Sequence, residues 1–233
     1  MDLLRKIQVY GDSILKGIEL DSAEKYVVPK ESGWKYLEKQ YPLSIVNRAK
    51  FGCTASKGLE QLSRALEKGL VCDAVVLEYG GNDCDYDWAA ISAHPQGIHQ
   101  PHTPLPEFIR CCREMIRLLR ARGILPIVMS LPPIDAERYF HWFCRQGLDK
   151  PAVLRWLGGD LQTIYRHQEM YSSALCRTAL EERALLVDVR TPFLEAKNCR
   201  ELLCADGIHP NREGHRLIGK VFGEFASQYL QPA

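Results

Sequence analysis

Acyl transfer requires three side chains that this sequence contains. They are Ser13, near the start of the chain, and Asp206 and His209, near its end. A serine hydroxyl is a weak nucleophile until an imidazole takes its proton, and the imidazole needs a third group that fixes its tautomer. Asp206 and His209 are three residues apart in a short loop bounded by Gly207 and Pro210. This spacing lets the carboxylate hold the Nδ1 proton of the histidine.

Gly52 and Asn82 could serve the same chemistry as hydrogen-bond donors. The tetrahedral intermediate of acyl transfer carries a negative oxygen, and each donor aimed at it contributes about 3 kcal/mol. Gly52 can offer its backbone N–H without a side chain that obstructs an ester, and Asn82 can offer its side-chain amide. Taken singly, Gly52 is also typical of a turn, and Asn82 of an Asx turn.

Short β-rich runs alternate with longer amphipathic ones, and this alternation predicts an α/β fold. The expected strands are Lys6–Tyr10, Leu43–Arg48, Ala74–Tyr79, Ile124–Ser130 and Leu185–Val189. We expect one helix over Thr54–Leu70, one that starts at Thr103-Pro104 with a threonine cap and proline in the first helical position, and a last one from about Asn211. Because crossovers between parallel strands are right-handed, we predict one doubly wound parallel sheet with helices on both faces.

The candidate residues all follow predicted strands. In an open parallel sheet, ligands bind beyond the carboxyl ends of the strands, near the point where the strand order reverses. Ser13 follows the first expected strand, Gly52 the second and Asn82 the third, and the loop with Asp206 and His209 comes after the fifth. We therefore expect these residues to lie at one edge of the sheet.

Four segments of the chain resemble, in order, the signature blocks of the SGNH (GDSL-type) hydrolase family. They are Gly11-Asp12-Ser13-Ile14, the run from Asn47 that contains Gly52, Gly80-Gly81-Asn82-Asp83, and Asp206-Gly207-Ile208-His209. Ile14 stands where many members of the family have leucine, which is a conservative apolar change. The resemblance spans nearly the whole chain and implies an esterase.

The resemblance also implies a role for each matching residue. Ser13 would be the nucleophile, with His209 as its base and Asp206 behind the histidine. The backbone N–H of Ser13, the backbone N–H of Gly52 and the amide of Asn82 would form the oxyanion hole. The family resemblance further implies a flavodoxin-like, five-stranded sheet in the order 2-1-3-4-5, and no metal or organic cofactor.

The same residues also have simpler interpretations. A Gly-Asp-Ser tripeptide is common in turns and helix caps, Asp206 could merely cap a turn, and His209 could lie near the surface. Three cysteines lie beside the blocks, which makes a cysteine nucleophile or a redox switch conceivable. These are Cys53, Cys84 and Cys204. Small buried side chains are the favoured interpretation of the cysteines, and four blocks in order favour the catalytic interpretation of the rest.

Two polar groups near the third strand could bind a metal, but neither matches a known pattern. Asp83, Asp85 and Asp87 alternate as at the start of a calcium loop, yet the glycine and the distal glutamate of such a loop are absent. The same segment contains three histidines, His94, His99 and His102. Their spacing matches no standard zinc site, so we predict no metal and expect these histidines to face solvent or substrate.

Two long segments interrupt the alternation, near residues 83–103 and 132–160. Loops of this length in a compact domain are usually functional. The second segment is rich in aromatic residues: Tyr139, Phe140, Trp142, Phe143 and Trp156. They could form the core of an inserted helical segment, or some could line an acyl or alcohol pocket, since concave sites are mostly apolar.

The length and composition are those of a globular protein. With 233 residues, of which 46% are hydrophobic and 25% charged, we expect a single domain over residues 1–233. The net charge of +1 gives no field that would attract nucleic acid. No apolar run reaches the roughly 18 residues of a membrane span, and none near the start resembles a signal peptide. Nine scattered cysteines disfavour a disulfide framework, so we expect a cytoplasmic location.

These observations together predict a serine hydrolase that cleaves small-molecule carboxylic esters, with short acyl or acetyl groups, through an acyl-enzyme intermediate. Tryptophans near the site could stack on a sugar, and no long exposed apolar stretch suggests a lid for lipid surfaces. The same triad would also allow thioester hydrolysis or acyl transfer to an acceptor other than water. The alternative from another class is a non-catalytic binding module for acylated ligands.

Overall fold

A five-stranded parallel sheet forms the centre of the molecule in the computed structural model, which describes residues 4–29, 33–145 and 147–229. Its strands are β1 (Lys6–Gly11), β4 (Ser44–Asn47), β5 (Ala74–Glu78), β6 (Leu125–Met129) and β7 (Leu185–Val187). They lie in the order β4-β1-β5-β6-β7, which is the predicted order 2-1-3-4-5 counted over the strands of this sheet. Each predicted strand is present, with both ends within two residues of the expected bounds.

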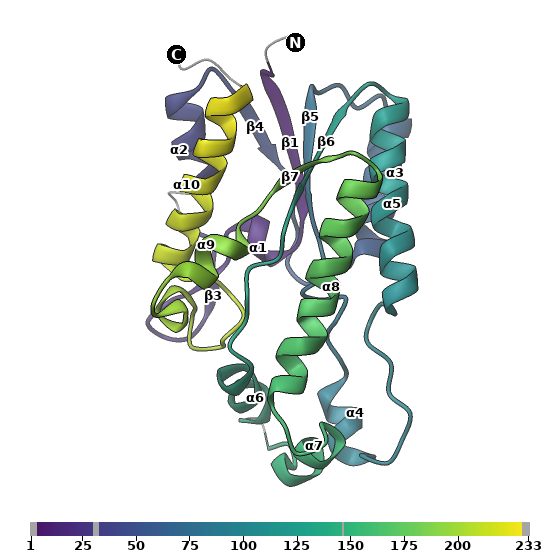
Figure 1. Ribbon diagram of the computed structural model, residues 1–233, viewed down its shortest axis with the longest axis vertical. Coiled ribbons are helices and arrows are strands. Elements are labelled where there is room, and N and C mark those ends of the chain that lie inside the picture. The colour runs from purple at the N-terminus through teal and green to yellow at the C-terminus, as the bar shows by residue number, and fades with distance from the viewer. Residues whose placement is uncertain (1–3, 30–32, 146, 230–233) are drawn as a thin grey trace.

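Helices cover both faces of the sheet, as the alternation predicts (Figure 1). One face carries α3 (Ala55–Glu67), α5 (Leu105–Ala121) and α8 (Gln162–Glu181), and the other carries α2 (Gly33–Gln40), α9 (Arg190–Glu195) and α10 (Arg212–Tyr229). Phe108 and Tyr171 belong to the core under the first group of helices. Ile218 and Phe222 of α10 pack with Val9 in the second core.

Several short elements lie at the carboxyl end of the sheet. Helix α1 (Ser13–Lys16) follows β1 directly, and the 3-10 helix η1 (Cys199–Leu202) precedes the loop that contains Asp206. Strands β2 (Glu19–Leu20) and β3 (Tyr26–Val27) form a small antiparallel hairpin. The sequence does not predict this hairpin, because strands of two residues are too short to show a period.

The two segments that interrupt the alternation contain three further helices. These are α4 (Trp88–Ala93), α6 (Ala136–Cys144) and α7 (Lys150–Trp156). Each starts at an aspartate whose side chain accepts a hydrogen bond from a backbone N–H of the first turn. Trp88, Phe140 and Val153 meet in a third apolar cluster, which lies beyond the lower ends of the strands in Figure 1. This helical extension stands beside the carboxyl edge of the sheet.

The start of α5 differs from the prediction. Pro104 takes the N-cap position in an extended conformation and is not the first helical residue. Thr103 does not cap the helix, because it is engaged elsewhere. Its side chain hydrogen-bonds to the Asp83 carboxylate, its N–H donates to the Asp83 carbonyl (3.0 Å), and its carbonyl accepts from the Tyr171 hydroxyl (2.7 Å).

Candidate active site

Ser13 lies at the point where the strand order reverses. From β1 the sheet continues to β4 on one side and to β5 on the other, and ligand sites form at such points. The Asp12 carboxylate accepts a hydrogen bond from Ile14 N–H (2.9 Å) and so caps α1. Ser13 is the first residue of this helix and is buried. The sequence Gly11-Asp12-Ser13 therefore fixes the serine directly after β1.

The loop with Asp206 and His209 depends on Gly207. This glycine has φ +76°, and a Cβ there would lie 2.6 Å from the Asp135 carbonyl oxygen. The loop is closed by a hydrogen bond from Cys204 N–H to the His209 carbonyl (2.8 Å). One oxygen of Asp206 accepts the backbone N–H groups of Ile208 and His209, both at 3.1 Å. The second Asp206 oxygen is thereby aimed at the histidine ring.

The side chains of Asp206, His209 and Ser13 form one hydrogen-bonded line. His209 Nδ1–H donates to Asp206 Oδ2 (2.6 Å), and the Ser13 hydroxyl donates to His209 Nε2 (2.9 Å). All three side chains are buried. Burial alone would raise the pKa of Asp206, but the hydrogen bonds and charge of His209 hold that pKa below its usual value. Asp206 is thus an ionised acceptor, which favours the Nδ1–H tautomer of His209.

Asn82 lies beside Ser13 and is bound to Asp12. Its Nδ2 group donates to Asp12 Oδ2 (2.9 Å) and makes a longer contact to the Cys53 carbonyl (3.4 Å). Asp12 is a further residue of the site, for which no function was predicted from the sequence. Its position between two matching residues of the first block was the available signal.

Gly52 lies in the turn after β4, with φ +67° and open space around it. A hydrogen bond from Lys50 N–H to the Gly11 carbonyl (2.9 Å) holds this turn against the end of β1. Phe51 lines the cavity at Ser13, whereas Gly52 is not among the residues that line this cavity. Gly52 is therefore next to the candidate site and at its edge.

A cavity of about 470 Å³ opens at Ser13, Asn82 and His209. Its wall includes eight aromatic side chains, from Tyr26, Phe51, Tyr86, Trp88, Tyr139, Trp142, Phe143 and Trp156. Of the aromatic residues singled out in the second long segment, four line this wall, while Phe140 packs in the third apolar cluster. A larger cavity, of about 770 Å³, lies between α2 and α10 and contains none of the candidate catalytic side chains. Of these two cavities, the smaller, aromatic one is the one in contact with the candidate catalytic side chains.

Two aromatic rings cover His209. The centroid of Tyr26 lies 5.0 Å from that of the imidazole, and Phe51 stacks on it at 6.0 Å with an interplanar angle of 12°. Burial, followed by the charge of Asp206, raises the pKa of Tyr26 to about 12, so this phenol stays neutral. Tyr26 comes from the small β2–β3 hairpin, and no pattern in the sequence indicates its place beside His209.

The three cysteines beside the blocks are buried. Burial raises the pKa of the Cys53 and Cys84 thiols, and that of Cys204 to about 11. A raised thiol pKa disfavours the thiolate that a cysteine nucleophile needs. The imidazole of His209 instead contacts the hydroxyl of Ser13.

The aspartates and histidines of residues 83–103 have separate contacts. Asp83 accepts from Ala55 N–H (2.9 Å), Asp85 accepts from the Tyr139 hydroxyl (2.7 Å), and Asp87 caps α4. His99 donates to the His94 carbonyl, and His102 donates to the Asn82 carbonyl. In the described parts of the chain, no group of three or more such residues is arranged to hold a metal ion.

Comparison with known proteins gives the family. The sequence profile of the GDSL-like lipase/acylhydrolase family matches residues 9–217. The chain belongs to this family. As a GDSL (SGNH) hydrolase it is a carboxylic ester hydrolase. The resemblance to this family that the four sequence blocks indicate is confirmed.

Individual relatives of this GDSL hydrolase are distant. The isoamyl acetate-hydrolyzing esterase of Saccharomyces cerevisiae is 28% identical, over 96% of this chain and 88% of the yeast protein. A lipase/acylhydrolase from Enterococcus faecalis has a similar fold, with a TM-score of 0.69 at 19% identity and 99% of each chain covered. An acetylxylan esterase from Geobacillus stearothermophilus has a TM-score of 0.63 at 20% identity, over 94% of this chain and 93% of the esterase.

Among the described helices of this GDSL hydrolase, none is both long and apolar enough to cross a bilayer.

Proposed function

We propose that this GDSL hydrolase cleaves short-acyl carboxylic esters, with Ser13 as nucleophile, His209 as base and Asp206 as the group that orients His209. One observation carries the proposal. The His209 ring joins Asp206 at 2.6 Å to the hydroxyl of Ser13 at 2.9 Å, which is within the range required for proton transfer by a general base.

The reaction would proceed in two halves. The Ser13 oxygen attacks the ester carbonyl while its proton moves to His209 Nε2, and the imidazolium is stabilised by Asp206. His209 then gives this proton to the departing alcohol, which leaves Ser13 acylated. In the second half a water molecule gives a proton to His209 and attacks the acyl-enzyme, and His209 returns the proton to Ser13 as the carboxylic acid departs.

The oxyanion formed in each half needs hydrogen-bond donors. We assign this role to the N–H groups of Ser13 and Gly52 and to the side-chain amide of Asn82. One amide hydrogen of Asn82 binds Asp12, while the second makes only the 3.4 Å contact with the Cys53 carbonyl, so the oxyanion can take it. The hydrogen bond that holds the Gly52 turn against β1 supports the role of Gly52.

The size and lining of the cavity support the proposed substrate class. Its volume of about 470 Å³ falls within the usual range for small-molecule sites, and its wall is mainly aromatic. The yeast relative, by its name, hydrolyses the acetate of a branched, apolar alcohol. We therefore propose acetate or other short-acyl esters of apolar alcohols as substrates of this enzyme.

A panel of esters run beside a serine variant tests the proposal. Wild-type enzyme should hydrolyse p-nitrophenyl acetate and isoamyl acetate faster than p-nitrophenyl palmitate or acetylated xylan. Ser13→Ala should abolish hydrolysis and labelling by a fluorophosphonate without loss of the fold, because the hydroxyl makes the covalent intermediate. Ser173→Ala, on the exposed side of α8, is the matched control and should behave as wild type.

Each of the following results would contradict a different part of the proposal. Activity that survives in Ser13→Ala, with labelling at Cys53 or Cys84, would establish a cysteine nucleophile. Preference for palmitate would overturn the short-acyl assignment, and preference for acetylated xylan would overturn the apolar alcohol. Faster cleavage of the thioester than of its matching ester would make the enzyme a thioesterase.

A further inference from the structure

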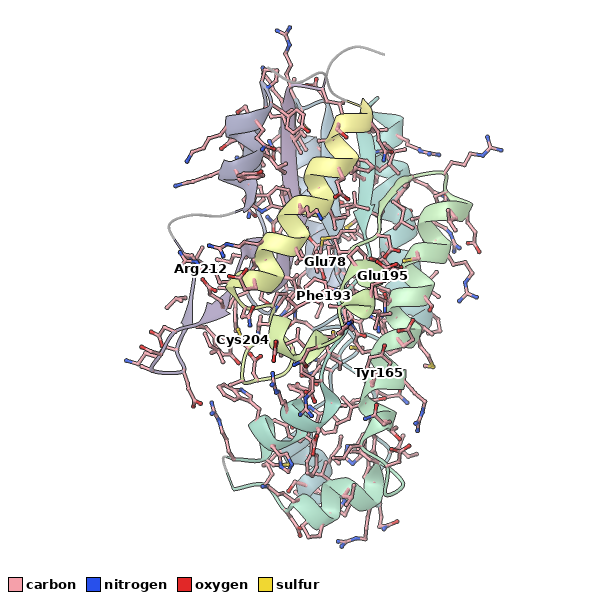
Figure 2. The ribbon with its side chains drawn as sticks, turned by 60° about the vertical axis from the view of Figure 1, so that its left-hand side comes forward. Glu78, Tyr165, Phe193, Glu195, Cys204 and Arg212 are labelled. Atoms are coloured by element: carbon pink, nitrogen blue, oxygen red, sulfur yellow. The ribbon has the colours of Figure 1, made fainter. Side chains whose placement is uncertain are left out.

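Glu78 is an acidic residue at the end of the central strand β5, whose other residues are apolar and buried. It pairs in register with Gly11 of β1, and Asp12 follows Gly11. A Cβ on Gly11 would lie only 2.7 Å from the Glu78 carbonyl oxygen, so the two strand ends approach closely. The exposed fractions of Glu78 and Asp12 are 0% and 1%, and Figure 2 shows Glu78 in the middle of the molecule. Two carboxyl groups thus interact in the interior.

The two carboxyl groups differ in their hydrogen bonds. Asp12 accepts from Ile14 N–H and from the Asn82 amide, each at 2.9 Å. Glu78 interacts with the backbone N–H and the carboxyl group of Asp12, and in the described part of the chain neither of its carboxyl oxygens has any other hydrogen-bond partner. A buried carboxylate with so few donors has a large desolvation cost, whereas a protonated carboxyl can itself donate to a neighbouring carboxylate. This difference in hydrogen-bond donors favours a proton on Glu78 and the negative charge on Asp12.

The surroundings of Glu78 favour the same distribution. Burial, followed by the charge of Asp12, raises the pKa of Glu78 well above its usual value, and Asp83 acts in the same direction. Burial also raises the pKa of Asp12, but its hydrogen bonds from Ile14 and Asn82 oppose that shift. Asp12 is therefore the member of the pair that is stabilised as the anion.

We infer that Glu78 is a positioning residue for the oxyanion hole, in which its carboxylic acid donates to Asp12 and Asp12 in turn holds the amide of Asn82. The inference rests on the proposed role of Asn82. With one amide hydrogen fixed on Asp12, the other hydrogen of Asn82 faces the reacting carbonyl. The shared proton also keeps the net charge of the pair at minus one. A second negative charge here would oppose the developing oxyanion.

Alkaline pH should remove this arrangement. When Glu78 loses its proton, it repels Asp12, the Asn82 amide loses its fixed acceptor, and kcat falls. The other titratable groups that act on the pair are Tyr79, Asp83, His209 and the thiols of Cys53 and Cys84, and all of them are kept in Glu78→Gln. Burial raises the pKa of Tyr79 well above its usual value, so it stays neutral, and Asp83, with a pKa of about 6, is already ionised. Burial also raises the pKa of the Cys53 and Cys84 thiols, which act on Asp12.

Two substitutions at Glu78 and one control test the inference. Glu78→Gln keeps a donor for Asp12 but cannot ionise, so kcat at neutral pH should stay within about 3-fold of wild type and the alkaline fall should disappear. Glu78→Leu removes the donor and should lower kcat about 10-fold or more with little change in KM. Val76→Ala, two residues earlier on the same strand and buried, should lower the thermal midpoint and leave the pH profile of kcat unchanged.

The measurements are kcat and KM for p-nitrophenyl acetate across neutral and alkaline pH, corrected for spontaneous hydrolysis. A Glu78→Leu change in an Asn82→Ala background should cost almost nothing further, because Glu78 acts through the Asn82 amide that the first change has already removed. An alkaline fall that persists in Glu78→Gln, or losses that multiply in the double variant, would overturn the inference. Either result would leave the proposed roles of Ser13, His209 and Asp206 intact, because those are tested by Ser13→Ala.

Discussion

The imidazole of His209 uses both ring nitrogens, one toward Asp206 and one toward Ser13. His209→Ala should therefore cost several decades in kcat, and Asp206→Asn about 10⁴-fold, because an amide can leave the imidazole in the wrong tautomer. Since the two residues act on one proton transfer, the double variant should lose far less than the product of the single losses. The check is kcat of both single variants and the double variant, and multiplicative losses would mean that they are not one relay.

Asn82 offers a second test at the level of a single side chain. Asn82→Ala should reduce kcat by about 10²-fold or more with a much smaller change in KM, because the amide acts mainly on charge that develops in the transition state. Steady-state kinetics with one short-acyl ester are sufficient. A change confined to KM would make Asn82 a substrate-binding residue.

Residues could be predicted where the signal is local in the chain. Asp206 and His209 are linked by their spacing, and Ser13 and Asn82 by their places after predicted strands. Tyr26 could not be found, because its approach to His209 depends on a two-residue strand and on tertiary packing. Glu78 had a weak signal, since an acidic residue ends an otherwise apolar strand, but its partner Asp12 is adjacent only once β1 and β5 pair.

At the scale of the element, the loop around Gly207 decides whether Asp206 and His209 meet Ser13. Gly207→Ala should reduce both activity and thermal stability, because the residue has a positive φ and the new Cβ would collide with the α6 backbone. Gly158→Ala is the matched control, since Gly158 has a similar φ of +74° in open space and loses only the conformational cost of about 1–2 kcal/mol. Equal losses of stability in the two variants would show that the close contact does not matter.

The sheet was more predictable than the segments around it. Strands such as β5 are continuous apolar runs, and the alternation with helices fixes parallel pairing. The segment 83–103 is predicted as a loop but contains α4, whereas the inserted helical segment considered for 132–160 is present as α6 and α7. Their helices are short and pack on one another across the chain, so their stability comes from the third apolar cluster and not from a long periodic pattern.

For the whole molecule, buried acids make stability depend on pH. The pKa of Glu78 is raised in the folded state above its ordinary value of 4.5, so its contribution is complete below that pH and is lost as the pH rises. The loss is about 1.4 kcal/mol per pH unit while only the folded state holds the proton. Glu78→Gln should therefore unfold at higher urea concentration than wild type at neutral pH, with a gap that grows toward alkaline pH. The exposed control Glu195→Gln should show no growing gap, and the same constant gap in both variants would contradict a buried proton.

The aromatic wall of the cavity has an optical consequence. The chain has four tryptophans, and Trp88, Trp142 and Trp156 line the cavity at Ser13. Trp34 instead packs against Phe222 under α10. A molecule that enters the cavity changes the surroundings of the indole rings in its wall, so the intrinsic fluorescence of the protein should report occupancy. In a Trp34→Phe background, all of the tryptophan emission would come from the substrate site.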